Sequence, residues 1–235
     1  MIKEIEEFYN KTKLKKVIAM SKGKTPIEYV HIFHKEYPRF PSIKLSKKLD
    51  NGEYNKLLKR RRSERIFSNK PVPIELVAKI FNSCRIVQAD PERRTYPSGG
   101  ARFPVEMYLV ASKINGLKSG IYHFNINKFS LETLFESDFK KDEIESISAY
   151  LKNVAGAIIL TTVISRSEVK YGLKAYPFSL IEAGHIGQNI LLSFTKYKIG
   201  SFPIGGFVND EIIELLDLTE DELPIYIIGF GSMTK

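Results

Sequence analysis

The chain has 235 residues, of which 43% are hydrophobic and 11% aromatic, enough apolar mass for a globular core. Its formal charge of +9 comes from 36 basic and 27 acidic residues mixed along the sequence, as is typical of a solvated lysine-rich surface. Composition therefore argues against a disordered chain and against nucleic-acid binding. If the positive charge has a function beyond solubility, a few arginines that bind a small phosphate-bearing ligand would account for it.

Targeting signals and cysteine content narrow the class further. No run of about 18 or more apolar residues is present, and the N-terminal segment MIKEIEEFYNKTKLKK carries charges where a signal peptide needs its apolar centre. We therefore expect a cytoplasmic protein with no membrane association. The single cysteine, Cys84, excludes an intrachain disulfide and a multi-cysteine metal site, and we expect it to be a small buried residue on a helix.

The first fifty residues differ in character from the rest. They are rich in lysine, with an apolar cluster at 27–33 followed by the proline-punctuated stretch YPRFPSIKL, which predicts one or two short helices and then an extended arm. No repeat or low-complexity linker divides the chain. We therefore expect an N-terminal extension over residues 1–50 and one domain over residues 51–235.

In the segments that follow, the pattern of apolar residues changes from helical spacing to that of β-strands. The stretch PIELVAKIFNSCRI places apolar residues at helical spacing after Pro73 and predicts an amphipathic helix. The short segments VEMYLVAS, GIYHFN and FSLETLF, rich in β-branched and aromatic residues and separated by turns, predict a strand meander. AGAIILTTVIS is apolar on both faces and predicts a central buried strand.

The segment FSLIEAGHIGQNILLSFTKYKIG, residues 178–200, predicts a long helix that is apolar nearly all round. Ala183, Gly184 and Gly187 form a narrow side where another helix can approach closely. Such a helix is buried on all sides, so we expect a second subunit to cover part of it. For His185 and Glu182, one turn apart, we favour a structural hydrogen bond in the core over a catalytic pair.

The chain closes with an amphipathic helix, DEIIELLDL, and a strand, PIYIIGFG. Strands and helices follow one another without regular βαβ alternation, which predicts an α+β fold rather than a doubly wound sheet.

Several chemistries lack their sequence signatures. Neither a GxGxxG following a strand nor a GxxxxGK[ST] is present, so a Rossmann nucleotide site and a P-loop are unsupported. No GxSxG elbow is present, which leaves nucleophilic hydrolysis without support. The histidines lack the spacing of metal ligands, so we expect no metal site; they are His31, His34, His123 and His185.

Three short motifs at element boundaries remain. KRRRSERIF, residues 59–67, places basic groups and a hydroxyl at an expected loop-to-helix junction, where they would suit a phosphate monoester; these are Arg61, Arg62, Ser63 and Arg65. A tight turn directly precedes a strand and consists of Pro97, Ser98, Gly99, Gly100 and Ala101. The third motif would let backbone N–H groups approach a flat ligand, and consists of Pro203, Ile204, Gly205 and Gly206.

Each motif has a simpler interpretation when taken alone. The basic run fits a solvated helix, and glycines in a hairpin accept positive φ without any ligand. Together and in this order, however, RRSER, PSGGA and PIGGF resemble the nitroreductase superfamily of FMN enzymes. The stretches RTYPSGGARFPVEMYLV, GLKSGIYHFN and KYGLKAYPFSLIEAGHIGQNILLSFTKYKIGSFPIGGF resemble more specifically its SagB-type branch, the azoline dehydrogenases of peptide-modifying pathways.

The resemblance implies a homodimer with a central, mainly antiparallel sheet flanked by helices and with FMN in the subunit interface. The motif that contains Arg61, Arg62, Ser63 and Arg65 would hold the FMN phosphate, ribityl chain and pyrimidine edge. The turn Pro97–Ala101 would pack on the isoalloxazine from the neighbouring subunit. Pro203–Gly206 would line the opposite side, with a backbone N–H near N5.

In the SagB-type branch a Lys-Tyr pair matters for catalysis, and Lys170 and Tyr171 occupy the matching KYG. Oxidation of an azoline removes a proton from one ring carbon and a hydride from its neighbour, so the site needs a base beside the flavin. Lys170 would be this base and Tyr171 a relay or positioning group. The alternative is that Lys170 is an ordinary surface lysine.

These features leave three functions open. The first is an FMN-dependent oxidoreductase that transfers a hydride at N5 and acts on a small molecule or on an azoline in a modified peptide. The second is a generic NAD(P)H-dependent nitro or quinone reductase. The third, a basic nucleic-acid-binding protein, leaves PIGGF and the apolar helix unexplained. One departure from classical nitroreductases is that the C-terminal end, GFGSMTK, offers only Lys235 to the phosphate.

Overall fold

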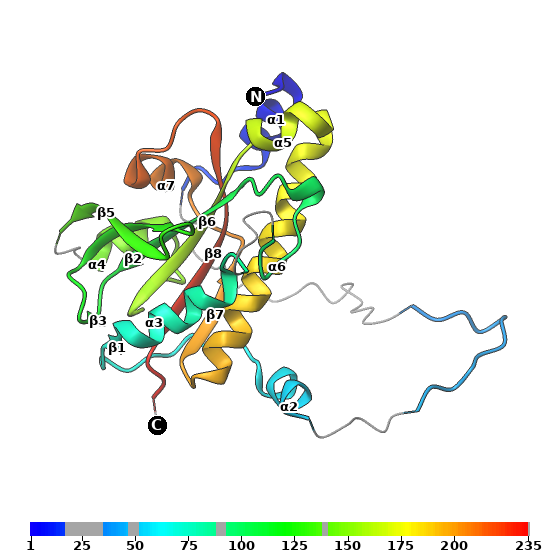
Figure 1. Ribbon diagram of the computed structural model, residues 1–235, viewed down its shortest axis with the longest axis horizontal. Helices are drawn as coiled ribbons and strands as arrows, with labels where there is room; N and C mark the ends of the chain where they lie inside the picture. The colour runs from blue at the N-terminus through cyan, green and yellow to red at the C-terminus, as the bar shows by residue number, and fades with distance from the viewer. Residues whose placement is uncertain (17–34, 47–51, 88–92, 138–140, 235) are drawn as a thin grey trace.

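The computed structural model describes residues 1–16, 35–46, 52–87, 93–137 and 141–234 (Figure 1). The predicted apolar cluster at 27–33, together with His31, His34 and Lys235, lies outside these ranges. In the described part of the chain no helix is both long and apolar enough to cross a membrane.

A six-stranded sheet forms the centre of the molecule, with the order β5-β4-β2-β6-β8-β7. Neighbouring strands are antiparallel throughout. The strands are β2 (Val105–Ala111), β4 (Gly120–Asn125), β5 (Ser130–Glu136), β6 (Gly156–Val163), β7 (Gly200–Ile204) and β8 (Glu222–Gly231). The predicted meander is confirmed as β2, β4 and β5. The prediction of an α+β fold with a mainly antiparallel sheet is confirmed as well.

Strand β6 lies inside the sheet, as its two-sided apolar pattern predicts. Ile158 pairs with Leu109 of β2 on one side and with Ile228 of β8 on the other. Side chains on both faces of the strand are buried, so each face of the sheet carries a hydrophobic layer of its own.

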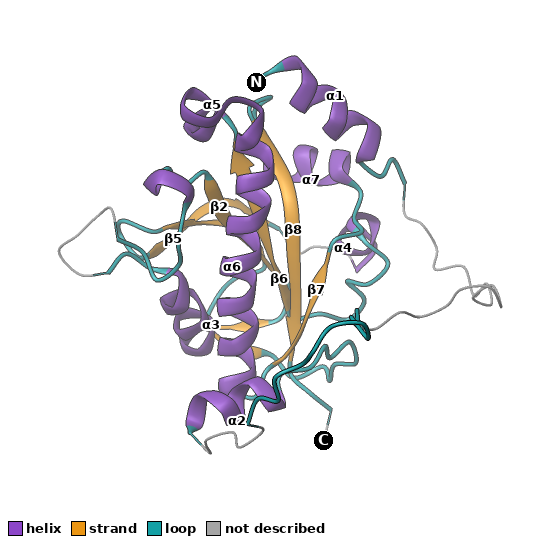
Figure 2. Cartoon of the chain, turned by 90° about the vertical axis from the view of Figure 1, so that its right-hand side faces the viewer, coloured by secondary structure: helices purple, strands orange, loops and turns teal. Residues whose placement is uncertain are grey.

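Helices cover both faces of the sheet (Figure 2). Helices α3 (Ile74–Phe81) and α6 (Ala175–Lys196) pack on one face, where their apolar residues form one core cluster with β2, β6 and β8. Helices α4 (Lys141–Ile147) and α7 (Asn209–Leu216) close the other face. The expected amphipathic helices at 73–86 and 210–218 correspond to α3 and α7.

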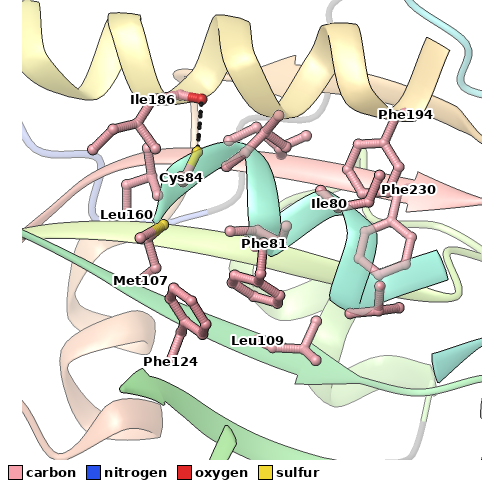
Figure 3. Packing of buried hydrophobic residues seen from close by; sticks show 14 of the residues in the cluster. Ile80, Phe81, Cys84, Met107, Leu109, Phe124, Leu160, Ile186, Phe194 and Phe230 are labelled. Atoms are coloured by element: carbon pink, nitrogen blue, oxygen red, sulfur yellow. Dashed lines mark hydrogen bonds between the residues drawn. The ribbon is translucent and has the colours of Figure 1, made fainter. Parts of the chain in front are cut away.

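Figure 3 shows the first core cluster from close by. Phe81 stacks on Phe124 at a centroid distance of 4.5 Å, and Phe194 stacks on Phe230 at 4.8 Å. Cys84, in the short 3-10 turn η1 (Asn82–Cys84), has its Sγ 3.8 Å from the Ile186 carbonyl oxygen. Burial raises the pKa of its thiol to about 12, so Cys84 is the inert core residue that the sequence predicts.

The remaining helices are α1 (Lys3–Thr12), α2 (Glu53–Arg60) and α5 (Ser165–Tyr171), with 3-10 turns η2 (Gly99–Ala101) and η3 (Gly172–Lys174). A short parallel pair joins β1 (Val72–Pro73) to β3 (Ile114–Asn115). Residues 35–46 contain no helix or strand and are exposed, as expected of an extended arm.

The environment of α6 bears on two expectations. Its N-terminal half exposes an apolar stripe in the single chain, with Phe178 36%, Leu180 41% and Ile181 56% accessible, which is the arrangement expected if a second subunit covers part of the helix. His185 lies on this exposed side, whereas Glu182 is only 2% exposed. The expected core hydrogen bond of His185 is therefore wrong, because only one face of α6 packs on the sheet.

Candidate functional site

The arginine segment follows a helix instead of preceding one. Helix α2 ends at Arg60, and Arg61 is already extended, with φ −61° and ψ 121°. The chain then runs beside β7, where the Glu64 N–H donates to the Ser201 carbonyl at 3.0 Å. The predicted loop-to-helix junction is wrong in direction, and the extended backbone is what places the arginines next to the strand that leads into Pro203–Gly206.

The side chains of this segment differ in how they are engaged. Arg62 forms an ion pair with Glu64. The guanidinium of Arg65 lies 5.5 Å from the centre of the Phe202 ring. Arg61 and Arg65 form no ion pair within the described residues, and Ser63 is half-buried between them. Guanidinium donors therefore remain available for an anionic ligand.

The loop after β7 leaves its backbone open. Among the described residues, a Cβ atom at Gly205 would meet nothing within 4 Å, and one at Gly206 would meet only Leu14 at 3.9 Å. Ser148 Oγ donates to the Gly206 carbonyl at 3.0 Å and holds the loop from below. A flat group could therefore lie directly on the backbone at Gly205. This is the role that we expect for the glycine pair from the sequence.

The turn Pro97–Ala101 packs against the Lys-Tyr pair within the same chain. Gly100 has φ +59°, and its Cβ would lie 2.7 Å from Lys170 Nζ and closer still to the Tyr171 hydroxyl oxygen. Ser98 Oγ accepts a hydrogen bond from the Phe103 N–H at 2.9 Å, which closes the turn. The glycine is needed because any side chain would displace both groups. The structure thus brings two separately predicted sets of residues together.

Helix α5, which ends with Lys170 and Tyr171, is tied to this turn by Arg166. Arg166 Nη1 lies 2.5 Å from Glu106 Oε1 and also donates to the Phe103 carbonyl at 3.2 Å. Arg102 Nε donates to the Arg166 carbonyl at 2.6 Å. The turn and the helix therefore form one hydrogen-bonded unit.

Glu106 extends this unit to a histidine on the neighbouring strand. His123 bridges two carboxylates, with Nε2 3.1 Å from Glu106 and Nδ1 3.0 Å from Glu132. The hydrogen bond to Glu106 raises the pKa of His123, which favours the imidazolium. The sequence gives no sign of this network, because its members come from three different strands.

A buried carboxyl group lies under the turn. Glu182 of α6 is within hydrogen-bonding reach of Ser98 and of the Val105 backbone, and its Oε1 has no partner among the described residues. Burial raises the pKa of Glu182 to about 7, against the lowering influence of Ser98 and of the Arg94 charge. The sequence signal that could have identified Glu182 as a buried carboxyl group, independently of His185, is a glutamate within an otherwise apolar helical segment.

A cavity of about 410 Å³ opens beside the turn, lined by residues 93–98 with Ala101 and Phe103. The Arg94 guanidinium lies over the Phe103 ring at 4.0 Å, and its Nη1 donates to the Tyr96 hydroxyl at 2.8 Å. Its Nε is buried without a partner in the described part of the chain. The turn thus borders a hollow that carries a positive charge.

The arginine segment and the turn do not meet within one chain. A Cβ atom at Gly99 would lie 3.6 Å from Cδ2 of Phe178, so the turn lies at the N-terminal end of α6. Helix α2, which leads into the arginines, lies at the other end of α6 (Figures 1 and 2). A ligand that touches both sets would need a second subunit.

Comparison with known proteins gives a consistent picture. The profile of the Nitroreductase family matches residues 58–232. Among curated relatives, MJ1384 of Methanocaldococcus jannaschii is 26% identical over 178 residues, which cover 74% of this chain and 88% of that protein. The trifolitoxin-processing protein TfxB of Rhizobium leguminosarum bv. trifolii is 31% identical over 146 residues, which cover 58% of this chain but only 39% of TfxB.

Among solved structures, the E. coli microcin synthetase McbBCD complex with truncated pro-MccB17 bound contains a chain of the same fold. The TM-score is 0.72 at 18% sequence identity, and the match covers 99% of this chain and 92% of that chain. At this identity the likeness concerns the fold alone.

Proposed function

Because the chain belongs to the nitroreductase family and is thus an oxidoreductase, we propose that it is an FMN-dependent enzyme that transfers a hydride at flavin N5. The observation that carries the proposal is the packing of Lys170 and Tyr171 on Gly100. This arrangement places an amine and a phenol on a turn of small residues, beside which a planar ring can lie.

The residues present fit FMN. Arg61, Arg62, Ser63 and Arg65 would hold the phosphate, the ribityl chain and the pyrimidine edge. Pro203, Ile204, Gly205 and Gly206 would support one face of the ring, since the space above Gly205 is open. Pro97, Ser98, Gly99, Gly100 and Ala101 would cover the ring from the partner subunit.

FMN supplies the acceptor for the hydride, and the chain supplies the proton transfer. In azoline oxidation, one ring carbon loses a hydride while its neighbour loses a proton, which Lys170 Nζ would take. Tyr171, whose ring meets Phe178 edge-on at 5.0 Å, would orient the amine or relay the proton. A backbone N–H of the Pro203–Gly206 loop would stabilise the charge that develops near N5.

Two arguments support an azoline in a modified peptide as the substrate. The pairing of a base with a flavin is what this oxidation requires. The relative TfxB is named for processing trifolitoxin, and the microcin synthetase structure of the same fold holds truncated pro-MccB17. A generic NAD(P)H-dependent nitro or quinone reductase is the second candidate, which the family membership favours. A basic nucleic-acid-binding protein would leave the Lys-Tyr-Gly packing without a purpose.

The same geometry supports a homodimer as part of the proposal. The exposed apolar stripe of α6 needs a cover, and the arginine segment and the turn lie at opposite ends of that helix. Two chains packed across α6 would complete each flavin site with residues from both.

The first experiment is an absorbance spectrum of the purified protein, with the released chromophore identified by mass. We expect bound FMN that NADPH reduces slowly under anaerobic conditions and that an azoline peptide reduces readily. Lys170→Ala should strongly reduce azole formation to a small residual rate and keep the FMN, whereas Lys174→Ala, an exposed lysine in the following turn, should behave as wild type.

Each other outcome points to a different function. Rapid reduction by NADPH without azole formation would establish the reductase. A colourless protein that takes up no added FMN would refute the flavoenzyme and favour a polyanion ligand for the arginines.

A further inference from the structure

Helix α1 precedes the family match at residues 58–232, yet it packs on the segments that carry the proposed chemistry. Figure 2 shows α1 at the same end of the molecule as α5. Its contacts reach from the end of α5 to the residues that follow the Pro203–Gly206 loop. A helix of ten residues spans about 15 Å, enough to bridge two such segments.

The N-terminal end of α1 holds α5. The backbone N–H of Ile2 donates a hydrogen bond to the carboxylate of Glu168, which lies two residues before Lys170 in α5. The Ile2 side chain also lies 4.0 Å from the Cβ position of Gly172, the residue directly after the Lys-Tyr pair. These contacts constrain the half of α5 that carries the proposed base.

The C-terminal end of α1 holds the segment after the glycine loop. Leu14 forms a parallel bridge with Val208, and its N–H donates to the Asn209 Oδ1 at 3.3 Å. Lys13 Nζ lies 2.6 Å from Asp210 Oδ1. Leu14 also lies 3.9 Å from the Gly206 Cβ position.

Two buried side chains anchor α1 between these ends. Ile5 and Tyr9, four residues apart, are each 4% exposed and form a small core with Ile164 and Leu223. Asn209 Nδ2 donates to the Tyr9 hydroxyl at 2.9 Å. Because Ile164 directly precedes α5, this core fixes the start of α5 as well.

We propose that α1 is a positioning element of the catalytic site, which fixes α5, and through it Lys170, relative to the Pro203–Gly206 loop. The inference rests on the proposed role of Lys170. Helix α5 has seven residues and exposes Val169 by 85%, so it is too short and too little packed to hold its own position. Arg166 ties down its first turn, and α1 ties down its last.

The test uses the full chain with Ile5→Asp, which places an unpaired carboxylate in the small core and undocks α1. We expect kcat for azoline oxidation to fall by about tenfold or more, with FMN content and KM unchanged, because small displacements of a catalytic group are costly. Asn10→Asp adds the same charge on the exposed side of α1 and should change kcat less than about twofold on the same reasoning. Tyr9→Phe, which removes only one hydrogen bond, is the milder variant if Ile5→Asp does not fold.

A double-mutant cycle separates positioning from general stability. In a Lys170→Ala background, Ile5→Asp should have almost no further effect on the residual rate. An equal loss in both backgrounds would overturn the proposal, since α1 would then stabilise the protein without acting through Lys170.

Hydrogen exchange gives a readout that does not depend on the reaction. We expect faster exchange of amides 165–171 and 208–210 in Ile5→Asp, with the central sheet unchanged. Unaltered exchange of 165–171 would refute the positioning role. If Lys170→Ala keeps full activity while exchange responds as expected, the role of Lys170 fails and the control of α5 by α1 stands.

Discussion

Gly100 lies directly against Lys170, since a Cβ atom at position 100 would be 2.7 Å from the Lys170 Nζ atom. The turn and the Lys-Tyr pair are separated by about seventy residues in the sequence, yet they form a single surface. The absence of a side chain at Gly100 is therefore what lets the two proposed proton-transfer groups rest on the turn.

Gly100→Ala should reduce catalysis more than stability. The positive φ costs an alanine roughly 1 kcal/mol, while the flexible ends of Lys170 and Tyr171 can move aside. We expect kcat for azoline oxidation to fall about tenfold, with a small decrease in Tm. Gly116→Ala is the control for backbone strain, since Gly116 also has a positive φ, at +86°, and its Cβ would meet only the Ile74 side chain among the described residues. An equal rate for the two variants would contradict the proposed geometry.

Gly205→Ala should weaken FMN binding without affecting the apoprotein. The added methyl group meets no atom of the described residues within 4 Å, so urea unfolding of the apoprotein should be unchanged. A bound ring would meet that methyl group, and a clash of about 1–3 kcal/mol corresponds to a Kd weaker by roughly 5- to 150-fold. Fluorescence titration with FMN measures it. An unchanged affinity would show that no ring lies on this backbone.

Ile181→Arg should dissociate the proposed homodimer. Ile181 is 56% exposed in the single chain, so an arginine there is harmless to the fold but unpaired when buried between two α6 helices. We expect sedimentation as a monomer together with loss of FMN. Lys198→Glu, beyond the C-terminal end of α6, should remain dimeric. A dimer that persists in Ile181→Arg would place the interface elsewhere.

Glu182→Gln should change how stability depends on pH. With a native pKa of about 7 against an ordinary 4.5, the folded state binds more protons than the unfolded state between these values. Wild-type stability therefore decreases as pH rises from 4.5 to 7, by about 3 kcal/mol at most, and then levels off.

The glutamine variant has no proton to lose in this window. Its free energy of unfolding should therefore increase relative to that of the wild type as pH rises. Urea unfolding across pH 4.5 to 7 measures the difference. The exposed Glu75→Gln variant should follow the wild-type curve. Parallel curves for wild type and Glu182→Gln would show that this carboxyl is ionised in the folded protein.

Local patterns predicted the parts of the fold whose signal is contiguous. The two-sided apolar pattern around Ile158 specified an interior strand, and the spacing of Val77, Ile80 and Phe81 specified a helix. Pro97–Ala101 and Pro203–Gly206 stand out by their own residues, whereas Lys170–Tyr171 enters only through the resemblance to the SagB-type branch. That the first and last of these touch could not be predicted, because only the docking of α5 brings them together.

Orientation on a helix is where local patterns failed. His185 and Glu182 are three residues apart and share much of one helical face, so periodicity alone does not say which side chain the sheet buries. The structure buries the glutamate and exposes the histidine. The contacts of α1 were equally unpredictable, because Ile5 and Tyr9 pack on residues more than one hundred and fifty positions away.

The burial of Cys84 makes the native protein unreactive toward thiol reagents without any substitution. A single cysteine introduced at an exposed position, such as Asn10 on α1 or Val169 on α5, would then be the sole target for a maleimide or a nitroxide. Pairs of such labels would report the separation of these helices in solution by electron spin resonance, against an otherwise silent background.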